Sequence, residues 1–160
     1  MIIMESAVNR VLNSIAQADE LYYRLVILVA PAGSGKTLAL REIHERISAQ
    51  FINVNLELAR IMLNLTERQR ALQLNRLLTE LINSSKSDIV LLDNIELLFD
   101  VSFKQDPLRL LQGLSRKKTV VAAWNGLSDG KYLFYATPDH PEYKKYSLKD
   151  FLIVNIEIAS

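Results

Sequence analysis

The 160-residue sequence contains no cysteine. This absence excludes a disulfide framework and any metal site built on thiolates, and it fits a protein of the cytosol. No apolar run approaches the ~18 residues of a membrane span. The first residues, Met1–Glu5, lack the basic start and the long apolar centre of a secretory signal peptide. The sequence therefore predicts a soluble, cytoplasmic protein without a membrane segment.

Excess charge is missing as well, because 19 lysine and arginine residues oppose 18 aspartate and glutamate residues and leave a net charge of +1. This balance argues against a protein that simply coats DNA. Apolar residues make up 49% of the chain, enough for a full hydrophobic core. No internal repeat, low-complexity tract or linker divides the sequence. We therefore expect one domain over residues 1–160, with a leading helix at 1–21 and a core at 24–157.

The most informative stretch is Ala30–Thr37, which reads Ala-Pro-Ala-Gly-Ser-Gly-Lys-Thr. It follows the apolar run Leu25–Val29 and precedes a segment suited to a helix, Leu38–Ile47. A strand, a glycine-bearing loop ending in Gly-Lys-Thr and a helix are typical of the phosphate-binding loop of nucleotide triphosphatases. The strict pattern begins with glycine, where this chain has Ala30. An ordinary strand-to-helix turn with an exposed lysine is the alternative interpretation.

The residue types of this loop suit a polyphosphate. Glycines let several backbone N–H groups point inward, and the start of the following helix carries about half a positive charge. Lys36 can reach the β and γ phosphates, and the hydroxyl of Thr37 can ligate the magnesium ion that bridges them. We therefore expect ATP and Mg²⁺ as ligands. The residues expected to hold the nucleotide are Pro31, Ala32, Gly33, Ser34, Gly35, Lys36, Thr37 and Leu38.

Apolar patterning predicts strands that alternate with helices. The expected strands are 24–30, 51–56, 88–93, 119–124 and 151–157. The expected helices are 4–21, 36–48, 66–82 and 107–116, with a short helix or helical turn at 57–63. Segment 126–150 is predicted as a loop that could include a hairpin at 132–135. Five strands with intervening helices predict an α/β fold whose parallel sheet is covered on both faces.

A second motif ends the third expected strand. Asp93 follows four apolar residues, and a carboxylate at the tip of such a strand can hold a water bound to magnesium. Many ATPases of this class place a glutamate next, which polarises the attacking water. Here Asn94 follows, and its amide can orient a water but cannot accept a proton. Either Glu96 takes over as the base, or Glu96 is a solvated helix residue and hydrolysis is slow.

The fourth expected strand ends in Trp124-Asn125-Gly126. A polar residue at its tip would face the γ-phosphate, so Asn125 is our candidate for a sensor of hydrolysis. The alternative is a plain turn residue, because Asn-Gly is a strong turn signal. The candidate catalytic residues are thus Lys36, Asn94, Glu96 and Asn125, and the candidate metal ligands are Thr37 and Asp93.

With these motifs the chain resembles the P-loop ATPases that insert a strand between the two nucleotide motifs, most nearly the AAA+ group. The resemblance covers about residues 24–157 and rests on Gly33–Thr37, Asp93 and Asn125. It implies a three-layer P-loop NTPase fold with a five-stranded parallel sheet in the order 5-1-4-3-2. Two features of the group are missing: room for a C-terminal helical lid, and an arginine between Asn125 and the last strand.

The missing arginine implies weak intrinsic turnover, or a finger supplied by a partner. Arg109 and Arg116 precede the fourth strand and are weaker candidates for that role. Two rival functions stay open. One is an interaction protein whose site binds nucleotide but hardly hydrolyses it. The other is a small-molecule kinase, although the arginines that usually clamp phosphates in kinase lids are not found.

The whole chain also resembles the BrxF family, small P-loop proteins of bacteriophage-exclusion (BREX) systems. Segments Leu92–Glu96 and Tyr135–Tyr143 carry this resemblance. It implies a bacterial or archaeal host and a role in anti-phage defence, with a methyltransferase and other BREX-system proteins as partners. A homo-oligomer stays open.

Four tyrosines interleaved with lysines could contact a partner or single-stranded nucleic acid, or could pack onto the sheet edge. We favour packing or a protein partner over DNA, because the overall charge does not support DNA contact. These tyrosines are Tyr132, Tyr135, Tyr143 and Tyr146.

Overall fold

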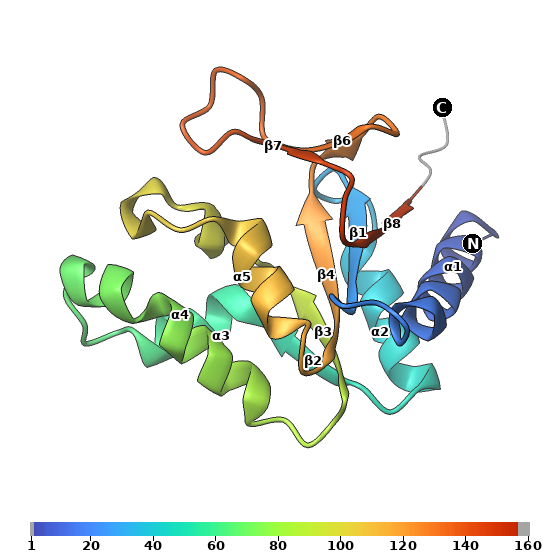
Figure 1. Ribbon diagram of the computed structural model, residues 1–160, viewed down its shortest axis with the longest axis horizontal. Helices are drawn as coiled ribbons and strands as arrows, with labels where there is room; N and C mark the ends of the chain where they lie inside the picture. The colour runs from blue at the N-terminus through green and yellow to red at the C-terminus, as the bar shows by residue number, and fades with distance from the viewer. Residues whose placement is uncertain (1, 157–160) are drawn as a thin grey trace.

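A five-stranded parallel sheet forms the centre of the protein, in a computed structural model that describes residues 2–156 (Figure 1). Its strands are β1 (Leu25–Ala30), β2 (Gln50–Asn53), β3 (Ile89–Asp93), β4 (Thr119–Asn125) and β8 (Leu152–Asn155). Their order is β2-β3-β4-β1-β8, and every neighbouring pair is parallel. Read from β8, this is the predicted order 5-1-4-3-2, so β4 lies between β1 and β3. The predicted end of the fifth strand, Glu157, lies outside the described residues.

Both faces of the sheet are covered, which explains why β1 is apolar along its whole length. Successive side chains of a strand point to opposite faces. Leu25 and Ile27 therefore pack into the hydrophobic cluster formed with buried side chains of the helices on one face. Val26 and Leu28 pack into the cluster on the other face. All six side chains of β1 are buried, as expected for a central parallel strand.

The helices divide between these two faces. In Figure 1, α1 and α2 lie to the right of the sheet, and α3, α4 and α5 lie to the left. Their bounds are α1 (Ile2–Ala18), α2 (Lys36–Arg46), α3 (Val54–Ile61), α4 (Glu67–Asn83) and α5 (Pro107–Leu114). Two 3₁₀ turns, η1 (Glu96–Phe99) and η2 (Val101–Phe103), connect β3 to α5. Among the helices within residues 2–156, none combines the length and apolar character that crossing a bilayer would require.

Side-chain caps fix where several helices begin. The predicted second strand, 51–56, stops at Asn53 because the Asn53 side chain accepts the N–H of Leu56 and starts α3. The capping box at the start of α4 is confirmed: Thr66 Oγ1 accepts the N–H of Gln69, and Gln69 Oε1 accepts the N–H of Thr66. The Asp106 side chain caps α5, as the sequence predicts.

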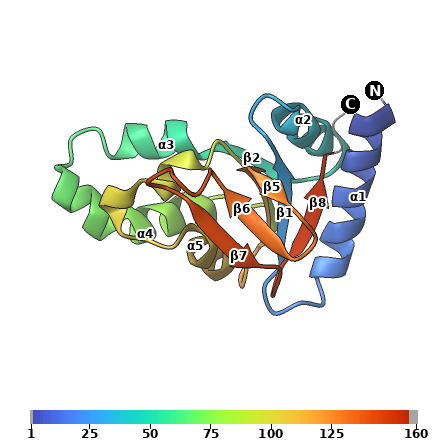
Figure 2. The same ribbon diagram turned by 90° about the horizontal axis from the view of Figure 1, so that it is seen from above.

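The prediction for residues 126–150 was wrong in part, because most of this segment is built around a second sheet. This small sheet has three antiparallel strands in the order β5-β6-β7. The strands are β5 (Leu127–Ser128), β6 (Tyr132–Tyr135) and β7 (Lys144–Ser147). The small sheet lies above the carboxyl ends of the central strands (Figures 1 and 2).

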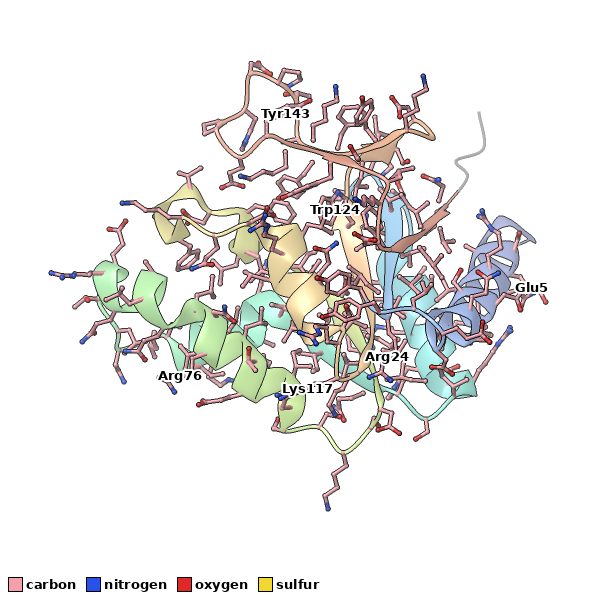
Figure 3. The ribbon with its side chains drawn as sticks, in the orientation of Figure 1. Glu5, Arg24, Arg76, Lys117, Trp124 and Tyr143 are labelled. Atoms are coloured by element: carbon pink, nitrogen blue, oxygen red, sulfur yellow. The ribbon has the colours of Figure 1, made fainter. Side chains whose placement is uncertain are left out.

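Contacts around Trp124 hold the small sheet to the core. Trp124 is fully buried, and its Nε1–H donates to the carbonyl of Phe134 on β6 at 3.0 Å (Figure 3). A Cβ atom at Gly126 would lie 1.9 Å from the same carbonyl oxygen, so only glycine permits this approach. Tyr135, the last residue of β6, stacks on Phe99 of η1 with ring centroids 3.5 Å apart. The small sheet is therefore tied to β4 and η1, the segments that carry the candidate residues Asn125 and Glu96.

Candidate active site

The phosphate loop lies at the carboxyl end of β1, where the chain turns into α2. Gly33 and Gly35 have φ angles of 78° and 93°, in the left-handed region that side chains disfavour. Gly35 occupies the cap position of α2 and has no side chain to satisfy the first N–H groups of the helix. These N–H groups and the helix dipole are therefore free to attract an anion that binds against the loop.

Lys36 is almost fully buried at the start of α2, with 7% of its surface exposed. Its Nζ donates to the carbonyls of Ala30 and Pro31, both at 2.8 Å. Burial lowers the pKa of this ammonium, while Glu96 and then Asp93 act in the opposite direction. Within residues 2–156, no carboxylate lies within ion-pair distance of Lys36. The ammonium is thus held at the loop by neutral carbonyls, and a phosphate is a stronger partner for it.

Thr37 and Asp93 meet at the carboxyl edge of the central sheet, although they are 56 residues apart in the sequence. Thr37 Oγ1 donates to Asp93 Oδ2 at 2.7 Å, and only 4% of Asp93 is exposed. Hydroxyl and carboxylate oxygens are ligands that Mg²⁺ prefers. Among the described residues, no three histidine, aspartate or glutamate side chains form a closed metal site. An ion at this place would therefore need phosphate or water for its remaining ligands, as Mg²⁺ commonly does.

A cavity of about 310 Å³ opens beside these groups. The loop, the ends of β3 and β4, and η1 line it. The lining residues are Ala32, Gly33, Gly35, Lys36, Thr37, Leu38, Asp93, Asn94, Glu96, Ala123 and Asn125. Of the expected nucleotide-binding residues, Pro31 and Ser34 do not line the cavity, and Pro31 contributes its carbonyl to Lys36. Arg109 and Arg116 do not line it either.

Glu96 lines the cavity at the first position of η1, so it is not a fully solvated helix residue. Burial raises the pKa of its carboxyl, and the charge of Asp93 adds to the rise. Backbone hydrogen bonds and Lys36 act in the opposite direction. The raised pKa of this half-buried carboxyl lies closer to the pKa range in which general bases operate.

Asn94 forms the turn that directs Glu96 toward the cavity. Its φ of 52° is left-handed, a conformation that asparagine tolerates better than most residues. Its carbonyl accepts the N–H of Asn55 at 2.9 Å, and Asn55 Oδ1 accepts the N–H of Leu97 at 2.8 Å. Sequence reasoning missed Asn55, which fixes η1 against the start of α3. No local signal marks Asn55, because its partners lie about 40 residues away in the sequence.

Asn125 is the last residue of β4 and pairs with Ala30 at the end of β1. The strand thus continues through Asn125, and the neighbouring Gly126 donates its N–H to the Ala30 carbonyl at 3.2 Å. The same carbonyl accepts Lys36 Nζ. Asn125 therefore stands beside the loop lysine and lines the cavity, where an amide can orient a water.

Comparisons with known proteins agree with this arrangement. The model of the ATPase family associated with various cellular activities (AAA) matches residues 26–126, which run from β1 to Gly126 and contain both motifs. Fifteen solved chains match, among them PCH-2 from C. elegans, with a TM-score of 0.54 at 15% identity. That alignment covers 100% of this chain and 44% of the PCH-2 chain, so this chain spans less than half of PCH-2. At this identity the likeness shows the fold alone. No curated protein sequence matches the chain.

Proposed function

The chain belongs to the ATPase family associated with various cellular activities (AAA), and from this premise we propose that its cavity binds ATP with Mg²⁺ and slowly hydrolyses the bond between the β and γ phosphates. The observation that carries the proposal is the 2.7 Å contact between Thr37 Oγ1 and Asp93 Oδ2 beside the buried Lys36. This contact joins the two nucleotide motifs in one pocket.

The donor set fits the proposed ligands. Neighbouring oxygen ligands of an octahedral Mg²⁺, each about 2.0–2.1 Å from the ion, lie about 2.9 Å apart. The oxygens of Thr37 and Asp93 are separated by 2.7 Å, so they need little adjustment to face one ion, directly or through a water. Thr37 and Asp93 would hold the Mg²⁺, which would supply positive charge to offset the charge that develops on the phosphates.

The remaining side chains supply positioning and proton transfer. Lys36 and the N–H groups at the start of α2 bind phosphate oxygens and offset their charge. Glu96 accepts the proton of the attacking water, a role that Asn94 cannot fill. Asn125 orients that water through its amide. We expect turnover to be low because Glu96 does not directly follow Asp93, and because no arginine is among the residues that line the cavity.

A specific observation favours a second candidate function, in which the site binds nucleotide but hardly hydrolyses it. Asn94 occupies the position next to Asp93, where many related ATPases carry a glutamate, and Glu96, the replacement base, stands two residues further along. In this case the protein would act as a nucleotide-controlled interaction protein.

Turnover distinguishes these two functions. We would measure phosphate release from ATP with Mg²⁺ for the wild type, Lys36→Ala and Lys86→Ala. Lys86 is an exposed lysine in the connection between α4 and β3, at the far end of the sheet, and serves as the matched control. Turnover in the wild type and Lys86→Ala, with none in Lys36→Ala, supports the ATPase. Binding without turnover supports the second function, and equal turnover in all three proteins contradicts hydrolysis at this site.

We further propose that the protein acts in anti-phage defence in the cytoplasm, beside a methyltransferase and other BREX-system proteins. The sequence resemblance of Leu92–Glu96 and Tyr135–Tyr143 to the BrxF family supports this role. Phage plating on a host whose system carries Lys36→Ala tests it. Loss of phage exclusion is the expected result, and unchanged exclusion would contradict a nucleotide-dependent role in defence.

A further inference from the structure

The two faces of the small sheet β5-β6-β7 differ in their surroundings. On the inner face, Leu133 is fully buried, and Tyr135 and Tyr146 pack around Trp124. Strand alternation and the β6–β7 register direct Tyr132 and Phe134 to the opposite, outer face. In Figure 2 the small sheet lies nearest the viewer, and no other described element covers it.

The outer face carries exposed apolar groups. The rings of Tyr132 and Phe134 lie side by side, with centroids 6.2 Å apart, and both side chains are only partly buried. Leu127 pairs with Phe134 across the β5–β6 ladder and is 62% exposed. A contiguous exposed apolar patch rimmed by polar residues marks an interaction site, whereas single exposed apolar residues do not.

One lysine lies against these rings. Lys145 pairs with Phe134 on β7, and its Nζ lies 4.1 Å from the centroid of the Tyr132 ring. Lys149 is exposed two residues beyond the end of β7, and Lys131 is exposed directly before β6, at a position that alternation directs to the inner face. The outer face of the small sheet thus combines flat apolar surfaces with ammonium groups.

The acidic residues of this segment are engaged or lie to the side. Asp129 accepts the N–H groups of Lys131 and Tyr132, both at 2.9 Å, and these two hydrogen bonds, with a smaller contribution from Lys145, lower the pKa of its carboxyl. Asp139 accepts the hydroxyl of Thr137 in the loop between β6 and β7. Glu142 belongs to the same loop, and Asp150 precedes β8. Segment 126–150 thus carries four lysines and four acidic residues, and Lys145 places a cation directly against the Tyr132 ring.

We propose that the outer face of the small sheet binds single-stranded nucleic acid, with bases stacked on Tyr132 and Phe134 and phosphates near Lys145 and Lys149. Aromatic rings on a sheet face, combined with nearby cations, bind single strands with little sequence preference. The two rings are inclined by 54° with centroids 6.2 Å apart, so they offer two separate surfaces for the bases of an extended strand. A duplex keeps its bases stacked and does not fit this surface.

Fluorescence anisotropy with a labelled 15-nucleotide oligothymidine at 50 mM salt tests the proposal. We expect the wild type to bind and Tyr132→Ala and Phe134→Ala each to weaken binding by about 5- to 100-fold. Tyr132→Phe keeps the ring and should keep the affinity. Tyr22→Ala removes another exposed tyrosine, which contacts Arg116 far from the small sheet, and should change nothing. Lys145→Gln should reduce the dependence of log affinity on log salt by about 0.7 if it contacts one phosphate.

Several outcomes would overturn the proposal. These are no binding by the wild type, equal affinity in Tyr132→Ala and Tyr22→Ala, or equally tight binding of a duplex. A labelled deca-glutamate peptide that binds in a Tyr132-dependent manner, where oligothymidine does not, would assign the surface to an acidic protein partner instead. Because Lys36 lies in the phosphate-loop cavity and not on the outer face of the small sheet, Lys36→Ala should retain oligothymidine binding, which keeps this test separate from the proposed ATPase.

Discussion

Replacing Gly126 with alanine should displace the small sheet from the end of β4. The added Cβ would lie 1.9 Å from the Phe134 carbonyl oxygen, so β6 must move by more than about 1 Å to restore ordinary contact. Such a movement lengthens the 3.0 Å bond from Trp124 Nε1 beyond hydrogen-bond range and leaves a buried donor unpaired. Overpacking costs about 1–3 kcal/mol, and the unpaired group costs about 1–3 kcal/mol more. The free energy of unfolding should therefore fall by about 2–6 kcal/mol.

Thermal unfolding measures this loss directly. For a chain of 160 residues, the expected decrease in Tm is about 5–20 °C. Gly113→Ala is the matched control, because a Cβ at Gly113 in α5 meets nothing within 4 Å and alanine favours the helix by about 0.5–1 kcal/mol. Gly113→Ala should raise Tm slightly. An unchanged Tm in Gly126→Ala would refute the argument that the β6 carbonyl and Trp124 fix the small sheet.

Two further perturbations test the site and the helix caps. Glu96→Gln should lower turnover by about 100-fold or more, because the proton acceptor is lost, while ATP affinity stays within a few-fold of the wild type. Turnover equal to that of the wild type would remove Glu96 from the mechanism. Since burial raises the pKa of Glu96 above 4.5, wild-type turnover should increase as pH rises through that pKa. The raised pKa also means that the folded protein loses stability over the same rise in pH, so Glu96→Gln should unfold at a higher temperature than the wild type at pH 7. Thr66→Ala removes the capping box of α4 and should cost about 1 kcal/mol in thermal unfolding, and no change would show that the cap is replaced by water.

The central sheet could be predicted from the sequence because its strands are continuous apolar runs that end at polar loops. The pairing of Thr37 with Asp93 followed from the same logic, since carboxyl ends of parallel strands share one edge of the sheet. The orientation of Glu96 could not be predicted. It depends on the left-handed turn at Asn94 and on Asn55, which no local pattern connects to it.

The small sheet was predicted only in part, as a loop that could include a hairpin at 132–135, for a different reason. Strand β6 reads Tyr-Leu-Phe-Tyr, so its buried and exposed positions are equally apolar and the alternation that marks a half-buried strand is hidden. The close approach that requires Gly126 is likewise a tertiary contact, although Asn-Gly at this point reads locally as a turn. The tyrosines that looked alike in the sequence therefore have different surroundings, with Tyr135 and Tyr146 packed inward and Tyr132 on the outer face.

Calorimetric titration with ATP and Mg²⁺ tests the central claim most directly, because it asks whether the loop, Lys36 and the Thr37–Asp93 pair form one nucleotide site. The wild type and Lys86→Ala should bind with the same affinity. Lys36→Ala should bind about 10- to 100-fold more weakly, as the loss of a charged hydrogen bond to phosphate requires. Equal affinity in Lys36→Ala and the wild type would contradict the claim that this cavity holds a triphosphate.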